Sequence, residues 1–314
     1  MHVLVTGGLG FVGNAVAHVL HDAGHQVSVL THSARYAERL PAGGQLLHAD
    51  VRDLDALRTA LSGQDVEGVC HLAGLARVRD SFEHPLDYFE INVAGTANLL
   101  RALADTTQGT PAVALASTGA VYGSGAKGKL TEDLPAIPDT PYAASKRAAE
   151  QVLEYHAQTG AVGAITLRCF AISGASNGVG DQDDTRIIPK ALRVAAGEAP
   201  SITINGDGSA QREFTHVLDV ADACRRALEA TRPGAHAYYN VGTGTGISMT
   251  DVVAAVGDIT GRQVPVEHGP PRPEPQILVA DPSAIQRDLG WSAPRSGLTT
   301  MIRDAWGALG EHVR

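Results

Sequence analysis

The stretch Val3-Leu-Val-Thr-Gly-Gly-Leu-Gly-Phe-Val-Gly13 lies at the start of the sequence and decides the fold. Its first four residues are apolar or β-branched and predict a short buried strand. Residues 11–23 carry apolar side chains at helical spacing and are followed by Gly24, which predicts a helix that ends there. The stretch therefore predicts a strand, a tight glycine turn and a helix in direct succession.

The three glycines of this turn have separate expected roles. Gly7 can form the tight turn, Gly10 lets the backbone approach a pyrophosphate, and Gly13 permits close packing of the helix on the strand. The helix N-terminus then faces the negative charge of the ligand. Three spaced glycines alone are a weak signal in a chain with 35 of them, but this strand-to-helix context is the one a dinucleotide site requires.

Outward from this unit, short apolar runs and longer helical segments alternate as far as Cys169. Strands are expected over residues 26–31, 45–50, 68–74, 112–118 and 164–169, and helices over residues 53–61, 86–105 and 142–157. Such alternation predicts an α/β fold in which a parallel sheet is covered by helices on both faces. With right-handed crossovers, this is the doubly wound Rossmann layout.

Beyond Cys169 the alternation breaks, which predicts a smaller C-terminal α+β substrate domain. Helices are expected over residues 186–196, 218–230, 250–260, 283–289 and 298–308, and strands over residues 201–205 and 238–241. At least one of these strands should return to the main sheet. The expected division is a Rossmann domain of residues 1–168 with returning segments at about 217–256, and a substrate domain of residues 169–216 and 257–314.

Composition excludes several classes of function. The 314 residues are 44% apolar and 19% charged, enough for a large core, and the formal net charge is −9. This charge argues against a general basic surface for nucleic acid and against a polybasic membrane anchor. The apolar runs are far shorter than the ~18 residues of a membrane span. Because the N-terminus also lacks a basic, signal-like region, a cytoplasmic location is expected.

The cysteines and histidines do not suggest a metal or disulfide site. Three scattered cysteines are too few for a disulfide framework or a structural zinc site. His18, His21 and His25 lie near one another, but no carboxylate or cysteine stands at ligand spacing beside them. No metal is expected.

Tyr142 and Lys146 are four residues apart on a predicted helix, so their side chains project from the same face. A free tyrosine is a poor base, and a neighbouring lysine cation favours its phenolate. The strand that precedes this helix ends in Ser117 and Thr118, whose hydroxyls can bond a substrate oxygen and complete a proton path. Together these residues form a set suited to hydride transfer at a carbinol.

The end of the second strand leaves the form of the dinucleotide open. NAD sites usually have a carboxylate there for the adenosine ribose, whereas a nearby arginine suits the 2′-phosphate of NADP. This chain has Thr31-His32-Ser33 followed by Arg35, with no carboxylate. NAD is the expected cofactor, with NADP as the alternative. Asp50 and Val51, at the end of the third strand, are expected at the adenine.

Several motifs in this order resemble the extended short-chain dehydrogenases/reductases, most closely the nucleotide-sugar enzymes of the UDP-glucose 4-epimerase type. They are residues 6–13, His71-Leu-Ala-Gly74, Asn92, Ser117-Thr-Gly-Ala-Val-Tyr-Gly123, Pro141-Tyr-Ala-Ala-Ser-Lys146, and Gly206-Asp-Gly-Ser209 with Arg212-Glu-Phe-Thr215. The resemblance runs from the first strand to the last helix. It implies a Rossmann domain that holds NAD(P) and a C-terminal domain that holds a nucleoside-diphosphate sugar.

The resemblance also implies roles for individual residues. Tyr142 would be the base, Lys146 would hold the nicotinamide ribose, and Thr118 would bond the sugar hydroxyl. Further cofactor contacts would come from Phe11, Val12, Leu72, Ala73, Gly74, Asn92, Ser117 and Phe170. Further substrate contacts would come from Ala76, Ala171, Arg186, Arg212 and Arg272, and planar guanidinium groups such as those of Arg212 and Arg272 suit a pyrophosphate.

Departures from the family pattern reduce the number of reactions that this chain could catalyse. Related dehydratases have an Asp-Glu pair directly after the hydroxyl residue, and decarboxylating relatives keep a glutamate there, but this chain has Gly119-Ala120. Elimination is therefore disfavoured. Where epimerases typically have asparagine this chain has Ala171, and the usual Arg-Pro-Gly-Asp loop reads Arg272-Pro-Glu-Pro275, so the base and sugar of the substrate stay open.

The sequence thus predicts a nucleotide-sugar 4-epimerase that acts through a transient 4-keto sugar. An NADPH-dependent nucleotide-sugar 4-ketoreductase is the alternative, and a dehydratase, a decarboxylase or a non-catalytic cofactor-sensing protein ranks lower. Helices 86–105 and 142–157 resemble those that pair two subunits of family members across a two-fold axis. A homodimer is accordingly expected.

Overall fold

The computed structural model describes residues 1–33, 35–271 and 276–312. Its largest element is a seven-stranded parallel sheet with the strand order β14-β7-β5-β4-β1-β2-β3. These strands are β1 (His2–Thr6), β2 (Gln26–Thr31), β3 (Gln45–His48), β4 (Gly68–His71), β5 (Ala112–Thr118), β7 (Gly163–Cys169) and β14 (His236–Val241). β1 and β7 are buried along their whole length because helices cover both faces of the sheet.

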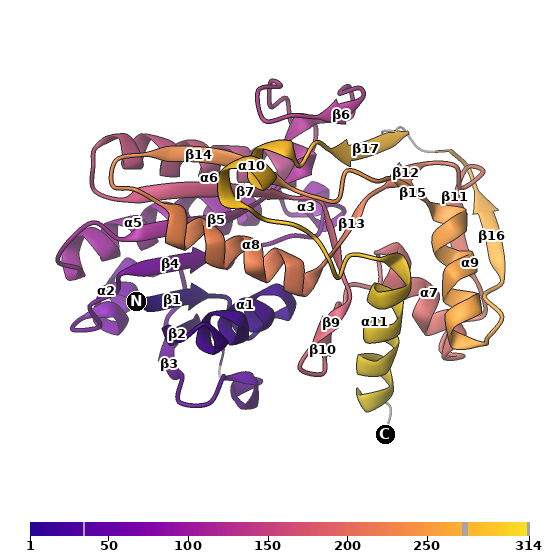
Figure 1. Ribbon diagram of the computed structural model, residues 1–314, viewed down its shortest axis with the longest axis horizontal. Coiled ribbons are helices and arrows are strands. Elements are labelled where there is room, and N and C mark those ends of the chain that lie inside the picture. Colours follow the sequence, from indigo (N-terminus) through magenta and orange to yellow (C-terminus); the bar gives the residue numbers. More distant parts are fainter. Residues whose placement is uncertain (34, 272–275, 313–314) are drawn as a thin grey trace.

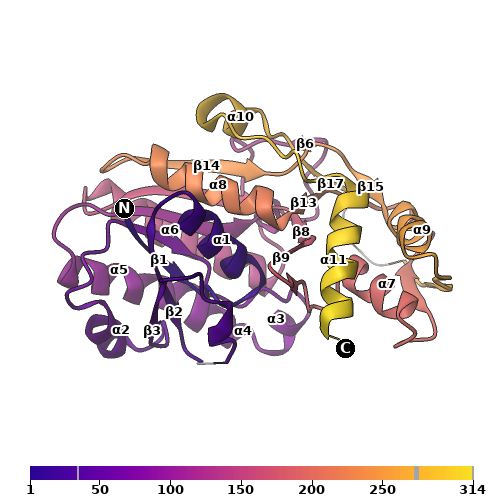
Figure 2. The same ribbon diagram turned by 60° about the horizontal axis from the view of Figure 1, so that its bottom comes forward.

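Two groups of helices cover the sheet. On one face α1 (Phe11–Asp22) packs against α8 (Val217–Ala230), side by side in Figure 2. The other face is covered by α2 (Leu54–Leu61), α5 (Gly95–Thr106) and α6 (Pro141–Gln158). The side chains of Asp53 and Thr140 cap α2 and α6 by accepting hydrogen bonds from backbone N–H groups. This arrangement confirms the expected α/β doubly wound Rossmann fold.

The helix expected over residues 86–105 is not a single α-helix. It consists of α4 (Pro85–Phe89), a π-helical turn over Glu90–Ala94, and α5. Asn92 lies in the π turn. Its side-chain oxygen accepts from the backbone N–H of Leu75, and its side-chain nitrogen donates to the backbone carbonyl oxygen of Leu75. π turns often occur at functional sites because the additional residue reorients a side chain. Hydrophobic spacing does not distinguish such a turn from continuous helix.

A second, smaller core lies beside the large sheet, to its right in Figure 1. It contains α7 (Ile187–Ala195), α9 (Met249–Thr260), α11 (Leu298–His312) and the parallel pair β11 (Ile202–Asn205) and β16 (Val266–Gly269). β14 returns to the main sheet beside β7. Residues 249–256, which the sequence assigned to the Rossmann domain, pack instead in the smaller core through Val252, Val253 and Val256.

Several very short strands join the two units and were not predicted. β6 (Lys129–Leu130), β12 (Gln211–Arg212), β15 (Ile247–Ser248) and β17 (Ile277–Ala280) form one sheet, β8 (Ala171–Ser173) pairs with β13 (Phe214–His216), and β9 (Ala175–Ser176) pairs with β10 (Val179–Gly180). The remaining helices are α3 (Asp80–Glu83) and α10 (Ser283–Leu289). Among the residues described, no helix is long and apolar enough to cross a membrane, and no group of metal-binding side chains is present.

Candidate functional site

A cleft of about 1100 Å³ opens at the carboxyl ends of the parallel strands, where ligands bind in open α/β sheets. Both units line it: β2, β5 and the loops after β1 and β4 contribute from the large sheet, and residues of the stretch 171–186 contribute from the smaller side. The cleft brings together most of the residues singled out from the sequence. They are Gly7, Gly10, Phe11, Val12, Gly13, Thr31, His32, Ser33, Arg35, Asp50, Val51, Leu72, Ala73, Gly74, Ala76, Ser117, Thr118, Tyr142, Lys146, Phe170, Ala171 and Arg186.

The glycine turn forms one end of the cleft. Gly7 has a φ of 70°, and its N–H donates to the carbonyl of Leu30 at 2.9 Å, which ties the turn to β2. A Cβ on Gly13 would lie 2.2 Å from the carbonyl oxygen of Gly7, so only glycine permits this approach. Gly10 is the N-cap of α1 and supplies no side-chain cap. The first N–H groups of α1 are thus open to an anionic ligand.

Thr118, Tyr142 and Lys146 line the same cleft. Thr118 ends β5, and Tyr142 and Lys146 lie one turn apart in the first half of α6. The ammonium group of Lys146 donates to the carbonyl oxygen of Ala116 at 2.8 Å. A lysine has three donors, so two remain for other partners.

The environment of these side chains alters their acidity. Burial raises the pKa of Tyr142, while a hydrogen bond with Thr118 and the positive charge of Arg186 both act to lower it. Burial lowers the pKa of Lys146 to about 8. Titratable groups with pKa values displaced by burial in a cleft are typical of catalytic sites.

A fully buried charge cluster lies behind this wall. Glu150, one turn beyond Lys146, has no exposed surface and accepts two hydrogen bonds from the guanidinium of Arg168, at 3.0 and 3.2 Å. The hydroxyl of Ser117 donates to the same carboxylate at 2.5 Å, and Arg147 adds a bond at 3.0 Å. The Ser117 proton therefore points away from the cleft. Glu150 and Arg168 were not among the residues predicted for the site.

A chain of side chains behind β4 orders the backbone that follows it. Thr6 accepts from the N–H groups of Leu72 and Ala73, so its hydroxyl proton is donated to Nδ1 of His71 at 2.8 Å. Nε2 of His71 contacts Thr96 at 3.0 Å, and burial lowers the pKa of His71 to about 3, so the ring is neutral.

Asn92 supports the same turn without lining the cleft. It is 2% exposed, and its side chain bonds Leu75 and the hydroxyl of Ser145. Asn92 was expected to contact the cofactor, but it lies behind Gly74. A Cβ on Gly74 would be only 2.6 Å from the Asn92 side-chain oxygen.

Asp50, expected at the adenine, is engaged with Arg52. The Nε and Nη2 atoms of Arg52 contact the two carboxylate oxygens at 3.0 and 2.7 Å, and the backbone N–H of Arg52 donates at 2.9 Å. The hydrogen bond from Arg52 lowers the pKa of Asp50 to about 2. The carboxylate is therefore ionised and largely neutralised by its partner.

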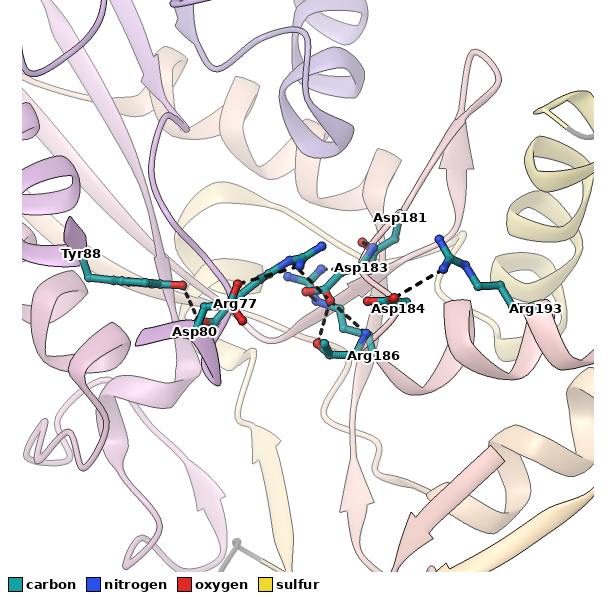
Figure 3. Close-up of polar contacts among 9 residues, drawn as sticks. Arg77, Asp80, Tyr88, Asp181, Asp183, Asp184, Arg186 and Arg193 are labelled. Atoms are coloured by element: carbon teal, nitrogen blue, oxygen red, sulfur yellow. Dashed lines mark hydrogen bonds and ion pairs between the residues drawn. The ribbon is translucent and has the colours of Figure 1, made fainter. Parts of the chain in front are cut away.

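An ion-pair network closes the opposite side of the cleft (Figure 3). Arg186, at the start of α7, contacts Asp181 at 2.9 Å and Asp183 at 3.4 Å. Arg77, in the loop after β4, reaches Asp183 from the other unit at 3.8 Å. Asp181 and Asp183 were not among the site residues predicted from the sequence. The stretch Asp181-Gln-Asp-Asp-Thr-Arg186, with several carboxylates close to an arginine, could have indicated this ion-pair network.

Of the two arginines expected at the substrate pyrophosphate, Arg212 is not among the described residues that line the cleft. Arg212 lies on β12, and its guanidinium donates to the carbonyl of Gln211 at 2.9 Å. Arg272 lies outside the described residues. Ala171, in contrast, begins β8 and lines the cleft next to Phe170.

The chain is similar to known proteins over its whole length. The model of the NAD dependent epimerase/dehydratase family matches residues 3–242. The UDP-glucose 4-epimerase of Corynebacterium glutamicum is 34% identical, and the match covers 99% of this chain and 97% of the relative. The UDP-glucose 4-epimerase of Streptomyces lividans is also 34% identical, over 96% of this chain and 94% of the relative.

Solved structures agree with these matches. A UDP-glucose 4-epimerase from Stenotrophomonas maltophila with bound NAD and formylated UDP-arabinopyranose has a TM-score of 0.93 at 32% identity, covering 100% of this chain and 99% of that one. A UDP-glucose 4-epimerase from Brucella ovis in complex with NAD has a TM-score of 0.91 at 32% identity, and the match covers 98% of both chains.

Proposed function

Because this chain belongs to the NAD dependent epimerase/dehydratase family, we propose that it is a nucleotide-sugar 4-epimerase that acts through a transient 4-keto sugar. The observation that carries the proposal is the meeting of Thr118, Tyr142 and Lys146 with the glycine turn in one cleft. Its relatives include UDP-glucose 4-epimerases, so a UDP-hexose is the proposed substrate.

The described residues of the cleft do not include the groups that elimination would need. Gly119 and Ala120 follow Thr118, and a Cβ on Gly119 would lie 2.8 Å from the ring of Phe170. Among the described residues that line the cleft, the carboxylates are those of Asp50, Asp181 and Asp183. Each of them is paired with an arginine. These features support oxidation and reduction at carbon rather than loss of water or carbon dioxide.

The residues present fit a pyridine dinucleotide. The close approach of Gly13 to Gly7 leaves a cradle that a side chain would fill, and the uncapped start of α1 presents N–H groups to a pyrophosphate. Gly7, Gly10, Phe11, Val12 and Gly13 would hold the pyrophosphate, and Leu72, Ala73, Gly74, Ser117 and Phe170 would border the nicotinamide half. When bound, the dinucleotide supplies the acceptor for a hydride.

The chain's own residues handle the proton. In the proposed reaction the phenolate of Tyr142 takes the proton of the sugar 4-hydroxyl and later returns it, while Thr118 bonds the sugar oxygen. Burial raises the pKa of Tyr142, and the hydrogen bond with Thr118 and the charge of Arg186 offset part of this cost. In the proposed reaction the Lys146 cation, one turn away on α6, would favour the phenolate further. Arg186, whose charge acts on Tyr142, and Ala171 would face the sugar from the smaller unit, and Ala76 would face it from the loop after β4.

We further propose that the protein is a cytoplasmic homodimer. Phe82, Leu86 and Phe89 expose apolar side chains on α3 and α4, and Leu86 is 81% exposed. Tyr155, 64% exposed, lies on α6, against which α4 packs. A cluster of exposed apolar side chains on neighbouring helices is typical of a surface that pairs two subunits. Light scattering should give the mass of a dimer at micromolar concentration, and Leu86→Glu should give that of a monomer.

The direct test of the activity is incubation of the purified protein with UDP-galactose, with no reductant added, followed by chromatography of the products. The proposal predicts an equilibrium mixture of UDP-galactose and UDP-glucose and no accumulation of free reduced cofactor. A reaction that proceeds only from a keto sugar, with consumption of one NADPH per turnover, would favour the ketoreductase instead. A free 4-keto product with loss of water would indicate a dehydratase.

A further inference from the structure

We propose that Glu150 is a positioning residue of the catalytic site: it fixes the end of β5 against α6, and its negative charge keeps Lys146 in the ammonium form. The inference rests on the proposed function, in which the Lys146 cation favours the phenolate of Tyr142. Glu150 has no exposed surface and is not among the described residues that line the cleft, so it acts through the residues that do.

The Glu150 carboxylate is held by donors from three elements. Ser117 of β5 donates to one oxygen at 2.5 Å, and Arg168 of β7 donates to both oxygens at 3.2 and 3.0 Å. Arg147, on α6 itself, donates to the second oxygen at 3.0 Å. Two guanidinium groups around one carboxylate favour its ionised form, so Glu150 carries a full negative charge inside the protein.

Two successive turns of α6 hold two successive residues at the end of β5. Glu150 accepts from the hydroxyl of Ser117, and one turn earlier Lys146 donates to the carbonyl oxygen of the residue before Ser117 at 2.8 Å. The next residue of the strand is Thr118, whose hydroxyl forms a hydrogen bond with Tyr142. The bond between Glu150 and the strand therefore sets how Thr118 is placed relative to the base.

The titratable groups that face Lys146 come from α6, β4 and β7. Burial lowers the pKa of Lys146 to about 8, while the Cys169 thiol and the Glu150 carboxylate both act to raise it. Burial raises the pKa of Cys169, so this thiol is neutral. Burial also lowers the pKa of His71 to about 3 and raises that of Tyr142, so both are neutral in the free protein.

The positive charges in this part of the molecule belong to arginines that already have partners. Arg168 and Arg147 are paired with Glu150, and Arg186, across the cleft, is paired with Asp181. Among the described groups that act on the pKa of Lys146, Glu150 is therefore the one that carries a negative charge at neutral pH.

The direct test is the titration of Lys146 in the purified full-length protein, after any bound dinucleotide has been removed. The chain has four lysines, so labelling of lysine Cε with ¹³C gives few NMR signals, and Lys146→Met identifies the one that belongs to Lys146. We expect a midpoint near pH 8 in the unmodified protein, and a midpoint about one pH unit lower in Glu150→Gln. An unchanged midpoint in Glu150→Gln would overturn the inference.

The pH profile of the activity gives a second measurement. In Glu150→Gln the alkaline limb of kcat/KM should move to lower pH by a similar amount, because Lys146 loses its charge sooner. Glu154→Gln, one turn further along α6, keeps the Glu150 carboxylate and should leave the NMR midpoint and the limb in place. A uniform loss of activity in Glu150→Gln, with the limb in place, would indicate a merely structural role and contradict the inference.

A double variant covers the case in which the unpaired Arg168 prevents Glu150→Gln from folding. Glu150→Gln combined with Arg168→Gln removes both buried charges together, which avoids an unpaired one. The midpoint of Lys146 should still lie below that of the unmodified protein, because Glu150 is the group of this pair that acts on Lys146. A midpoint equal to that of the unmodified protein would overturn the inference here too.

The conservative variant separates the charge from the position. Glu150→Asp keeps the negative charge but shortens the side chain by one methylene, which draws the carboxylate away from Ser117. The midpoint of Lys146 should stay near pH 8, whereas kcat should fall about tenfold, because the end of β5 is no longer fixed. An unchanged kcat in Glu150→Asp would contradict the role of Glu150 in placing the strand.

The outcome distinguishes this inference from the proposed function. If the protein interconverts UDP-galactose and UDP-glucose and Glu150→Gln has the alkaline limb and the Lys146 midpoint of the unmodified protein, the epimerase stands and the role of Glu150 is wrong. If the protein does not interconvert these sugars but Lys146 titrates at lower pH in Glu150→Gln, Glu150 controls Lys146 and the proposed reaction is wrong.

Discussion

The two ends of the cleft differ in how their functional side chains are held. At the catalytic end Tyr142 and Lys146 are each 8% exposed, and the Glu150 carboxylate behind them is completely buried. At the adenosine end Tyr36 is 38% exposed, and Arg35 lies on the surface of a turn. The first end depends on buried charges, and the second depends on stacking and backbone contacts at the rim.

The difference reflects what each end must do. A base whose pKa is set by burial and by neighbouring cations must be kept from water, and this requires a rigid, costly surrounding. The rim needs only polar groups that can reach a ligand from solvent, so exposed arginines suffice there. Substitutions at the catalytic end should therefore affect activity and stability strongly, whereas those at the rim should mainly affect the affinity for the ligand.

The largest effect is expected at Tyr142. Tyr142→Phe removes the proposed base and should lower kcat by about 10³-fold, within the range attributed to proton transfer by a positioned side chain. The fold should persist because the ring remains in place. Tyr155→Phe, on the exposed face of the same helix, is the matched control and should keep normal kcat. Unchanged activity in Tyr142→Phe would remove the basis of the mechanism.

The second largest effect is expected for a substitution of Glu150, which should lower the free energy of unfolding. Glu150→Gln leaves Arg168, which is 3% exposed, without its counter-charge, and unpairing a buried charge costs about 3 kcal/mol or more. Denaturant unfolding measures this loss. In Glu154→Gln, one turn further along α6, the amide oxygen can still accept the bond from Tyr238, so only the charge of that bond is lost and the cost should be about 1 kcal/mol or less. Equal losses in the two variants would show that the buried cluster is not what holds this end.

Replacement of Lys146 should change the unfolding free energy by a similar amount, but in the stabilising direction. Its pKa in the folded protein is about 8, below the ordinary 10.5, so the folded state disfavours the charge. At pH 7 Lys146→Met should therefore increase the unfolding free energy of the cofactor-free protein by about 3 kcal/mol, less the lost bond to Ala116.

The pH dependence provides the check for Lys146. Between pH 8 and 10.5 the unfolded chain binds more protons at this site than the folded one, so the stability contributed by this site rises with pH there. The advantage of Lys146→Met over the unmodified protein should shrink across that range, as measured by denaturant unfolding at several pH values. A constant difference would mean that Lys146 is not charged and buried in the folded protein.

The smallest effect is expected at Arg77. Its contact with Asp183 joins the two units at 3.8 Å, but the arginine side chain is half exposed. Exposed pairs contribute about 1 kcal/mol or less, so Arg77→Gln should shift the unfolding free energy by no more than that. A high-salt measurement on the unmodified protein should give a change of the same sign. A loss of several kcal/mol would make this contact essential for holding the units together.

The sequence predicted the elements whose pattern is local. The alternating strands and helices, the glycine turn and the Tyr142–Lys146 pair all follow from spacing along the chain, and the structure places the last two in one cleft. The strands of two or three residues were missed because they are stabilised by partners far along the chain, as β12 is by β15 and β17. No periodicity exists in so short a segment.

The other features that were not predicted depend on interactions between residues far apart in the sequence. The helix 86–105 contains a π turn because Asn92 bonds Leu75 and Ser145, and the bond between Glu150 and Arg168 joins residues 18 positions apart. The bond from Arg39 to the carbonyl oxygen of Leu9, which joins residues 30 positions apart, was not predicted either. Side chains of this kind carry no signal until their partners are known.

The central claim is that carbon 4 of the sugar gives up a hydride and receives the same one back while Tyr142 moves the proton. Conversion of UDP-galactose carrying deuterium at carbon 4 tests it most directly, with the product analysed by mass spectrometry and NMR. The account predicts UDP-glucose that keeps the deuterium at carbon 4, without added reductant. Loss of the label to water, or its appearance in free reduced dinucleotide, would contradict it.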